Sequence, residues 1–289
     1  MLKVTKLTDN VDIDKGTVML LGGFDGLHAG HRALLSYAKF AGLPVGIMTI
    51  IGGKGDQSLF TLSERAKIFQ ENGADFIFEL PFSEIKDLSP NNFLQLLKTE
   101  CNPKLLVCGE DFRFGAGAQG NPEFLKDRGQ VRVEVQNLLK IGGEKVSSGN
   151  IKKHILQGEV EKARALLEAP FFVEGEVVTG RQIGRTIQFP TANVAYPKDK
   201  IALKKGVYQT ETTIDGKTYK GITNYGARPT FDNDEVWTET HLIGFDGNLY
   251  GKRLTINFIK FLREIKKFDN ASALKAQLEE DVRRVTEDD

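Results

Sequence analysis

Apolar runs alternate with helix-like patterns through the first half of the chain. Four short apolar runs typical of buried strands lie at residues 17–21, 43–51, 75–79 and 104–108. Apolar residues at helical spacing predict three helices, at 32–40, at 62–71 after the cap Thr61, and at 90–98 after the cap Ser89. Strands that alternate with helices in this way are typical of a doubly wound parallel sheet with helices on both faces.

The pattern changes in the second half. One long helical pattern covers 150–168 and ends at Ala169–Pro170, where we expect a domain boundary. Beyond that point, polar and apolar residues alternate with period two in four stretches, at 172–178, 206–213, 218–223 and 253–258. Residues 214–217 have the composition of a tight hairpin turn, and 244–248 that of a longer one.

These patterns predict an α/β chain of two domains. Residues 1–169 are expected to form the doubly wound parallel-sheet domain. Residues 170–289 are expected to form a small antiparallel β-barrel, followed by an amphipathic helix at 271–286. The length of 289 residues agrees with two domains of roughly 150 residues each.

Composition narrows the class of protein. Lys plus Arg and Asp plus Glu both number 39, and a net charge of zero argues against bulk binding to nucleic acid or anionic membranes. The sequence has no apolar run of about 18 residues that could span a bilayer, and its first residues lack the apolar core of a signal peptide. Two cysteines, Cys101 and Cys108, are too few for a disulfide scaffold. We therefore expect a soluble cytoplasmic protein.

The segment Gly-Gly-Phe-Asp-Gly-Leu-His-Ala-Gly-His at 22–31 carries the strongest chemical signal. It joins the predicted strand 17–21 to the predicted helix 32–40, and it holds two of the four histidines, His28 and His31. Glycines allow the backbone to approach a phosphate chain, and a helix N-terminus offers unpaired N–H groups. No Gly-Lys-Ser/Thr closes the turn as in a Walker loop, and the imidazoles stand where a dinucleotide fingerprint needs small residues. The segment predicts a nucleotide-handling site.

Two further segments could complete that site. Cys-Gly-Glu-Asp-Phe-Arg-Phe-Gly at 108–115 follows a predicted strand, as the histidine turn does, so both loops should lie at the carboxyl edge of the sheet. Val-Ser-Ser-Gly-Asn-Ile-Lys at 146–152 places two hydroxyls before a helix and a lysine one turn in. Ser147 or Ser148 alone would suit an ordinary N-cap, but beside the histidine turn the segment favours a second phosphate cradle.

Together these segments resemble the nucleotidyltransferase domain of prokaryotic riboflavin kinase/FAD synthetases. The second half extends the resemblance: Gly-Arg-Thr-Ile-Gln-Phe-Pro-Thr-Ala-Asn at 184–193 is similar to that family's kinase signature. Five more blocks follow in the family's order, at 206–208, 226–231, 239–241, 249–251 and 262–268.

The resemblance implies two ATP-dependent reactions. The second half would transfer the γ-phosphate of ATP to riboflavin, giving FMN. The first half would transfer AMP from a second ATP to FMN, giving FAD and pyrophosphate. ATP and Mg²⁺ are the implied cofactors, with riboflavin, FMN and FAD as substrates and products. Nucleic acid and membranes are not expected partners, and the chain is expected to be a monomer or a weak homo-oligomer.

The resemblance also assigns roles to residues of this sequence. The implied catalytic residues are His28, His31 and Glu239, the last as the base for the riboflavin hydroxyl. The implied ATP and phosphate contacts are Gly22, Gly23, Phe24, Asp25, Gly26, Gly109, Asp111, Phe112, Arg113, Ser147, Ser148, Lys152, Gly184, Arg185, Pro190 and Thr191. The implied flavin contacts are Arg228, Pro229, Thr230 and Arg263, and the implied metal ligands are Thr191 and Asn193.

The sequence departs from the family's pattern at three places. Residues 49–55, with Gly52-Gly53-Lys54, replace an aromatic-Asp-Pro-His-Pro-like segment, and Gly149 and Lys152 replace a hydroxyl residue and an arginine. Gln188 stands where a glycine is usual. Three hypotheses therefore stand side by side: a bifunctional enzyme, a transferase with one inactive domain, and a non-enzymatic flavin-binding regulator. No helix-turn-helix or basic run supports the third.

Overall fold

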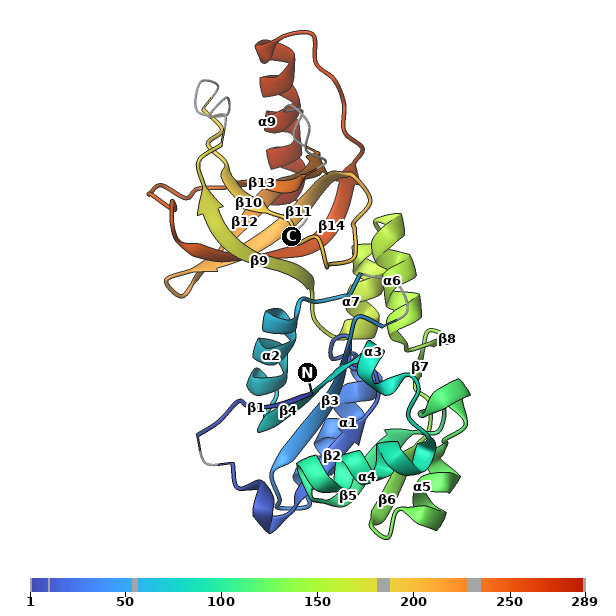
Figure 1. The fold of residues 1–289 in the computed structure, drawn as a ribbon. Coiled ribbons are helices and arrows are strands. Elements are labelled where there is room, and N and C mark those ends of the chain that lie inside the picture. The colour runs from blue at the N-terminus through green and yellow to red at the C-terminus, as the bar shows by residue number, and fades with distance from the viewer. Residues whose placement is uncertain (1, 10, 54–56, 181–187, 228–234, 288–289) are drawn as a thin grey trace. The chain divides into compact units, whose positions relative to one another are not determined.

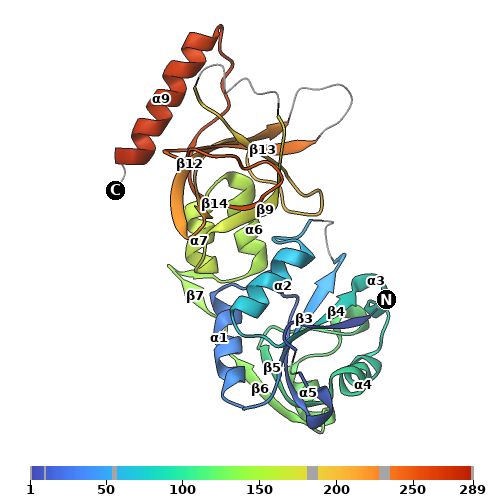
Figure 2. The ribbon, with the colours of Figure 1, turned by 90° about the vertical axis from the view of Figure 1, so that its left-hand side faces the viewer.

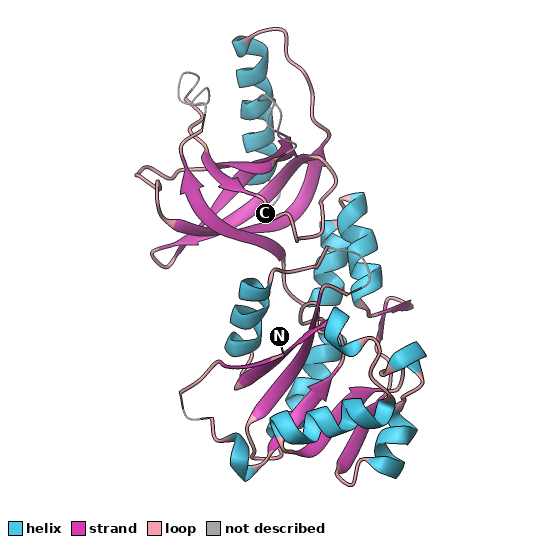
Figure 3. Cartoon of the chain, viewed as in Figure 1, coloured by secondary structure: helices cyan, strands magenta, loops and turns pink. Residues whose placement is uncertain are grey.

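The computed structural model describes residues 2–9, 11–53, 57–180, 188–227 and 235–287. The chain divides into two compact units, Met1–Ser148 and Gly149–Asp289 (Figure 1). The first unit interleaves strands with helices, whereas the second is built mainly of strands (Figure 3). Each unit is described separately below.

The first unit contains a six-stranded sheet in the order β1-β4-β3-β2-β5-β6. Its strands are β1 (Lys3–Lys6), β2 (Thr17–Leu21), β3 (Val45–Ile51), β4 (Phe76–Pro81), β5 (Pro103–Gly109) and β6 (Arg132–Gln136). The predicted strands β2 to β5 are confirmed, and they pair in parallel. The edge strands β1 and β6 were not predicted because their alternating polar residues lack the apolar run of a buried strand. The antiparallel strand β1 makes the sheet mixed.

Helices cover both faces of this sheet, as expected. Its helices are α1 (Ala29–Lys39), α2 (Leu62–Glu71), α3 (Phe82–Ile85), α4 (Pro90–Cys101) and α5 (Pro122–Arg128). Alternate residues of β2 point to opposite faces: Val18 and Leu20 pack toward α1, and Met19 and Leu21 toward α4. Figure 2 shows α1 and α4 on opposite sides of the sheet.

Side-chain caps begin two of these helices where the sequence predicted them. Thr61 and Glu64 form a reciprocal capping box at the start of α2, and the Ser89 hydroxyl accepts the Asn92 N–H at the start of α4. Two short 3₁₀ turns, Ile13–Lys15 and Ala116–Ala118, and the hairpin of β7 (Lys140–Ile141) and β8 (Glu144–Lys145) complete the unit.

The single helix predicted at 150–168 is wrong. The segment forms two helices, α6 (Ser148–Gln157) and α7 (Val160–Leu167), which are separated at Gly158 with a φ of +79°. Apolar spacing continues across the break, but a residue in the left-handed region cannot continue a right-handed helix. Glu159 after the break accepts a hydrogen bond from His154 Nδ1 at 2.7 Å. α7 packs against strands of the second unit.

The second unit contains a closed six-stranded barrel in the order β10-β13-β12-β11-β14-β9. Its strands are β9 (Phe171–Val178), β10 (Ala192–Ala195), β11 (Gly206–Ile214), β12 (Lys217–Ala227), β13 (Val236–Leu242) and β14 (Arg253–Arg263). Four were predicted, while β10 and β13 were not. Asp215 and Gly216 form the predicted hairpin turn, with φ values of +49° and +80°.

The predicted final helix is α9 (Ala271–Glu287). Val285 of this helix packs on Val207 and Ile222 of the barrel, whose side chains form a small apolar cluster. Both cysteines of the chain, Cys101 and Cys108, are free thiols in the first unit, and burial raises the pKa of each to about 12. Among the residues that the structure describes, no helix has both the length and the apolar character needed to cross a membrane.

Candidate functional site

The turn at 22–31 connects β2 to α1 and is held by its own two histidines. His28 is the N-cap of α1, and its Nδ1 accepts the backbone N–H of His31 at 3.2 Å. His31 Nδ1 lies 2.8 Å from the carbonyl oxygen of Gly26. The spacing of three residues between the histidines is therefore the spacing of a helix cap, with the second ring tied back to the turn.

The imidazole of His31 lies between two other rings. Phe24 stacks on it at 4.0 Å between ring centroids, and His28 stacks at 3.6 Å. Phe24 reaches this position with a φ of +39°, in the left-handed region. Gly22 must lack a side chain because a Cβ there would come within 2.9 Å of the Phe24 ring. The glycines thus serve the packing of the turn as well as backbone access.

These contacts determine the tautomer of each neutral histidine. A carbonyl oxygen only accepts, so His31 donates through Nδ1 and its Nε2 carries a lone pair. His28 accepts through Nδ1, so its Nε2 carries the hydrogen. Burial lowers the pKa of His28 to about 4, and burial together with the neighbouring His28 holds the pKa of His31 well below its usual value. Both rings are therefore neutral at pH 7.

A cavity of about 1000 Å³ opens beside this turn, at the upper end of the range for small-molecule sites. Three segments distant in sequence line it: the histidine turn, the loop after β5, and the residues around β7, β8 and the start of α6. The sequence-derived candidates that the structure brings together there are Gly22, Gly23, His28, His31, Gly109, Asp111, Phe112, Arg113, Ser147 and Ser148. Phe24, Asp25 and Gly26 are not in the lining, but Phe24 and Gly26 contact His31, which is.

The cavity also contains residues that the sequence did not single out. Lys145 Nζ lies 2.6 Å from Asp111 Oδ2, and Lys86 adds a second cation to the lining. Phe82, Leu138 and Leu139 are exposed apolar side chains on the same wall. These isolated lysines and apolar residues belong to no motif, so no sequence signal could have found them.

In the second unit, strand pairing brings the kinase candidates together. Asn193 of β10 lies directly opposite Glu239 of β13, and Glu239 lies opposite Asn224 of β12. Directly opposed residues of antiparallel strands point to the same face, so these three side chains form one row. Asn193 Nδ2 donates to the Thr191 carbonyl at 3.2 Å. Gly180 has to be small, because a Cβ there would come within 2.6 Å of the same amide.

The segment before β10 is tied to β13. His241 lies 2.9 Å through Nδ1 from the carbonyl of Pro190, and its ring packs against Phe189 with centroids 4.9 Å apart. Thr191 and Pro190 line a cavity of about 100 Å³ together with Thr240 and residues 245–250. Gln188, at the position where the resemblance implies a glycine, has a φ of +67°, which glycine adopts without strain.

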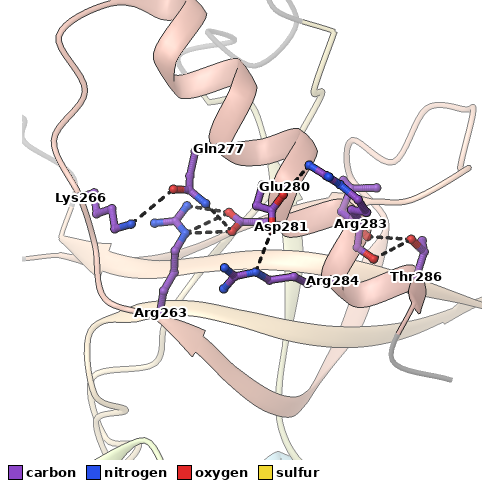
Figure 4. Close-up of polar contacts among 9 residues, drawn as sticks. Arg263, Lys266, Gln277, Glu280, Asp281, Arg283, Arg284 and Thr286 are labelled. Carbon is purple, nitrogen blue, oxygen red and sulfur yellow. Dashed lines mark hydrogen bonds and ion pairs between the residues drawn. The ribbon is translucent and has the colours of Figure 1, made fainter.

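Arg263 is held by the C-terminal helix. Its Nε and Nη2 bind the carboxylate of Asp281, at 2.7 Å for the shortest contact (Figure 4). Its Nη1 donates to the Glu264 carbonyl. Asp281 is fully buried, and Gln277 donates a further hydrogen bond to it. The expected contact of Arg263 with flavin stays a prediction.

Several candidates cannot be placed in this way. Gly184, Arg185, Arg228, Pro229 and Thr230 lie outside the described residues, as does Lys54. Lys152 is half-buried on α6, and Gly149 lies in the first turn of that helix.

The oxygen donors in the second unit suit magnesium. Within the described part of the chain, no group of three or more His, Cys, Asp or Glu side chains could hold a metal ion. The Thr191 hydroxyl and the Asn193 amide oxygen are hard ligands, of the kind that Mg²⁺ accepts alongside substrate phosphates. The Asn193 N–H bonded to the Thr191 carbonyl orients the amide, so the residues present fit this ion.

Comparison with known proteins matches both units. Residues 10–150 match the family model for FAD synthetase, and residues 167–288 match that for riboflavin kinase. A solved structure titled as a macrolide-efflux protein from Streptococcus pneumoniae shares the fold with a TM-score of 0.86, at 29% identity and 96% coverage of both chains.

Curated relatives carry the same pair of domains. A bifunctional riboflavin kinase/FMN adenylyltransferase from Buchnera aphidicola is 32% identical over 291 residues, which cover 93% of both chains. The protein of that name from Escherichia coli K12 is 33% identical over 285 residues, which cover 92% of this chain and 91% of the relative. The chain therefore belongs to the family of bifunctional riboflavin kinase/FMN adenylyltransferases.

Proposed function

We propose that this chain makes FAD in two ATP-dependent steps, one in each unit. The second unit phosphorylates riboflavin to FMN, and the first unit adenylylates FMN with release of pyrophosphate. The observation that carries the proposal is the cavity beside the stacked histidines, where three sequence-derived phosphate segments meet. Family membership over more than nine-tenths of the chain supports both steps.

In adenylyl transfer, a phosphate oxygen of FMN attacks the α-phosphorus of ATP while the bond to pyrophosphate breaks. Negative charge builds on the α-phosphoryl oxygens, and donors already directed at them stabilise that charge. His28 offers the Nε2 hydrogen for this purpose. His31 presents a lone pair when neutral and becomes a donor once it takes up a proton, which the polyphosphate charge favours. Ser147, Ser148 and Arg113 supply further donors along the cavity wall.

Riboflavin phosphorylation follows the same logic of positioning and charge neutralisation. Glu239 accepts the proton of the ribityl 5′-hydroxyl as the hydroxyl oxygen attacks the γ-phosphorus of ATP, while the bond from that phosphorus to ADP breaks and ADP leaves. Asn193, which lies directly opposite Glu239 across the strand pair, and Thr191 would hold Mg²⁺. Bound there, this ion would neutralise phosphate charge.

The experiment is product chromatography after incubation of the purified chain with Mg-ATP and either riboflavin or FMN. Formation of FAD from both mixtures would support a bifunctional enzyme. FAD from FMN alone would leave the second unit inactive, and FMN alone from riboflavin would leave the first inactive. Bound flavin with no product from either mixture would support a flavin-binding regulator.

Two single variants assign the activities to their residues. His31→Ala should abolish FAD formation from FMN while FMN formation from riboflavin continues. Glu239→Gln should stop FMN formation and spare adenylylation. Each variant controls for the folding of the other, and an unchanged FAD yield from His31→Ala would remove that histidine from the mechanism.

Three coarser features complete the proposal. We propose a functional boundary near residue 169, because the two family matches leave most of the α6–α7 segment between them. We propose that the chain acts in the cytoplasm, where its two buried thiols remain reduced. We also propose a monomer or weak homo-oligomer that binds no nucleic acid, which sedimentation with and without RNA would test.

A further inference from the structure

A buried arginine, Arg65, contacts the histidine turn and the two segments packed beside it. Arg65 of α2 is 3% exposed. Its Nε donates to the Phe60 carbonyl at 2.9 Å, and its Nη2 donates to the Ser58 hydroxyl. Both partners belong to the segment that leads into α2. The guanidinium therefore ties this segment to the helix.

The other donors of Arg65 reach the end of β3 and the histidine turn. Nη1 donates to the Thr49 hydroxyl at 3.0 Å and to the Ile50 carbonyl at 3.1 Å. Nη2 lies 3.3 Å from Asp25 Oδ1 in an ion pair. Four hydrogen bonds and one ion pair therefore surround the guanidinium. Such pairing is what makes a buried charge tolerable.

The partners of Arg65 support the turn on both sides of the His31 ring. The Thr49 hydroxyl donates to the carbonyl of Phe24, the residue that stacks on His31. On the other side, the Phe60 ring packs against Gly26, whose carbonyl accepts the His31 Nδ1 hydrogen. A Cβ at Gly26 would come within 2.8 Å of the Phe60 ring, so this contact is close.

Asp25 joins the two sides. Its Oδ1 accepts the backbone N–H of Leu59 at 3.0 Å as well as facing Arg65. The ion pair thus connects the middle of the turn to the segment before α2. All these residues belong to the first unit, and the buried guanidinium is itself held away from solvent.

We propose that Arg65 is a positioning residue for adenylyl transfer, which acts by fixing the His31 ring through Phe24 and Gly26. The proposal rests on the proposed function of the first unit and adds a residue to it that contacts no substrate. A lysine cannot reproduce the planar five-donor fork, so Arg65→Lys keeps the charge and loses the geometry.

The activity test uses Arg65→Lys with FMN and Mg-ATP as substrates. We expect kcat for FAD formation to fall by about 10- to 100-fold, the scale of a misplaced catalytic group, with KM for ATP little changed. Riboflavin phosphorylation by the same chain should be unaffected. The exposed Arg128→Lys at the end of α5 is the matched control and should change neither reaction.

A double variant separates positioning from general loss of structure. If Arg65 acts on His31 through Phe24, Arg65→Lys should cost little further activity in a Phe24→Leu background, because the two changes disturb one unit. Thr49→Val, which removes the hydroxyl, should lower kcat for FAD formation as Arg65→Lys does. Thr49→Ser, which keeps the hydroxyl, should have the activity of the wild type. The proposal would be overturned if the losses of the two single variants multiplied in the double variant. It would also be overturned if Thr49→Val and Thr49→Ser lost activity equally.

The closing measurement does not depend on activity. Imidazole nitrogens labelled with ¹⁵N report the tautomer of each ring by NMR, and the chain has only four histidines. The wild type should show His31 with its hydrogen on Nδ1 at pH 7, and Arg65→Lys should mix the tautomers. An unchanged His31 signal would refute the positioning role. A wild type that makes no FAD would instead refute the proposed function.

Discussion

His28 and His31 stack face to face, with ring centroids 3.6 Å apart, and their Nδ1 atoms have opposite hydrogen-bonding roles. Nδ1 of His28 accepts a hydrogen bond, whereas Nδ1 of His31 donates one. Two charged imidazoles at this distance would repel each other, and their burial adds to the cost of charging. The free chain therefore holds a neutral pair.

This neutrality predicts a loss of stability in weak acid. The pKa of His28 is lowered to about 4 in the folded chain, against an ordinary value of 6.5. Between these values the unfolded chain binds more protons, so stability falls as the pH drops from about 6.5 toward 4. The full shift corresponds to about 3 kcal/mol. Denaturant unfolding at pH 7, 6, 5 and 4 would measure it.

His28→Asn is the matched control for this pH dependence. Asparagine caps a helix as well as any residue but does not titrate. The stability of the wild type relative to this variant should therefore decrease as the pH falls below about 6.5. Parallel curves for the two proteins would contradict the assignment to His28.

Gln188→Gly should stabilise the second unit. The φ of +67° at this position costs a side-chain-bearing residue about 1 kcal/mol, and glycine adopts it freely. Thermal unfolding should therefore shift upward for Gln188→Gly but not for Gln188→Ala, which keeps the Cβ. If Gln188→Ala raised the unfolding temperature as much as Gln188→Gly, the gain would come from removal of the glutamine side chain and not from relief of backbone strain.

Removal of Asp281 should destabilise the second unit strongly. Asp281 is fully buried, and the Arg263 side chain bound to it is mostly buried. Asp281→Ala leaves an unpaired buried cation, at a cost of about 3–5 kcal/mol. The uncharged double variant Arg263→Met/Asp281→Leu should lose less of the free energy of unfolding than Asp281→Ala does. Denaturant unfolding of both variants would measure this. A cost below about 1 kcal/mol for Asp281→Ala would mean that the pair behaves as a solvent-exposed one.

Local patterns were sufficient for much of the fold. The apolar runs of β2 to β5 and the caps Thr61 and Ser89 were predicted correctly because strand burial and helix capping depend on neighbouring residues. Strands β10 and β13 were missed because the polar residues that make their site, such as Asn193 and Glu239, interrupt a simple strand pattern. The break at Gly158 was missed because the apolar period continues through it.

Some residues of the candidate site could likewise be predicted from local sequence, and others could not. Glycines, histidines and serines in short segments predicted a phosphate site, since a loop that binds phosphate through its backbone needs those residue types close together in sequence. Lys145 beside Asp111 and Arg65 behind Phe24 carried no such signal. Each is an ordinary cation in sequence, and its role depends on partners far along the chain.

By itself, the sequence determined the periodicity of the two halves, the helix caps Thr61 and Ser89 and the residue types available to phosphate and metal. Only the tertiary structure decided which tautomer each histidine holds, which carboxylate Arg263 meets, and which loops share one cavity. The physical reason is the range of the interactions. Periodicity and caps act within one or two turns of chain, whereas burial, ion pairing and ring stacking depend on segments that meet only when the chain has folded.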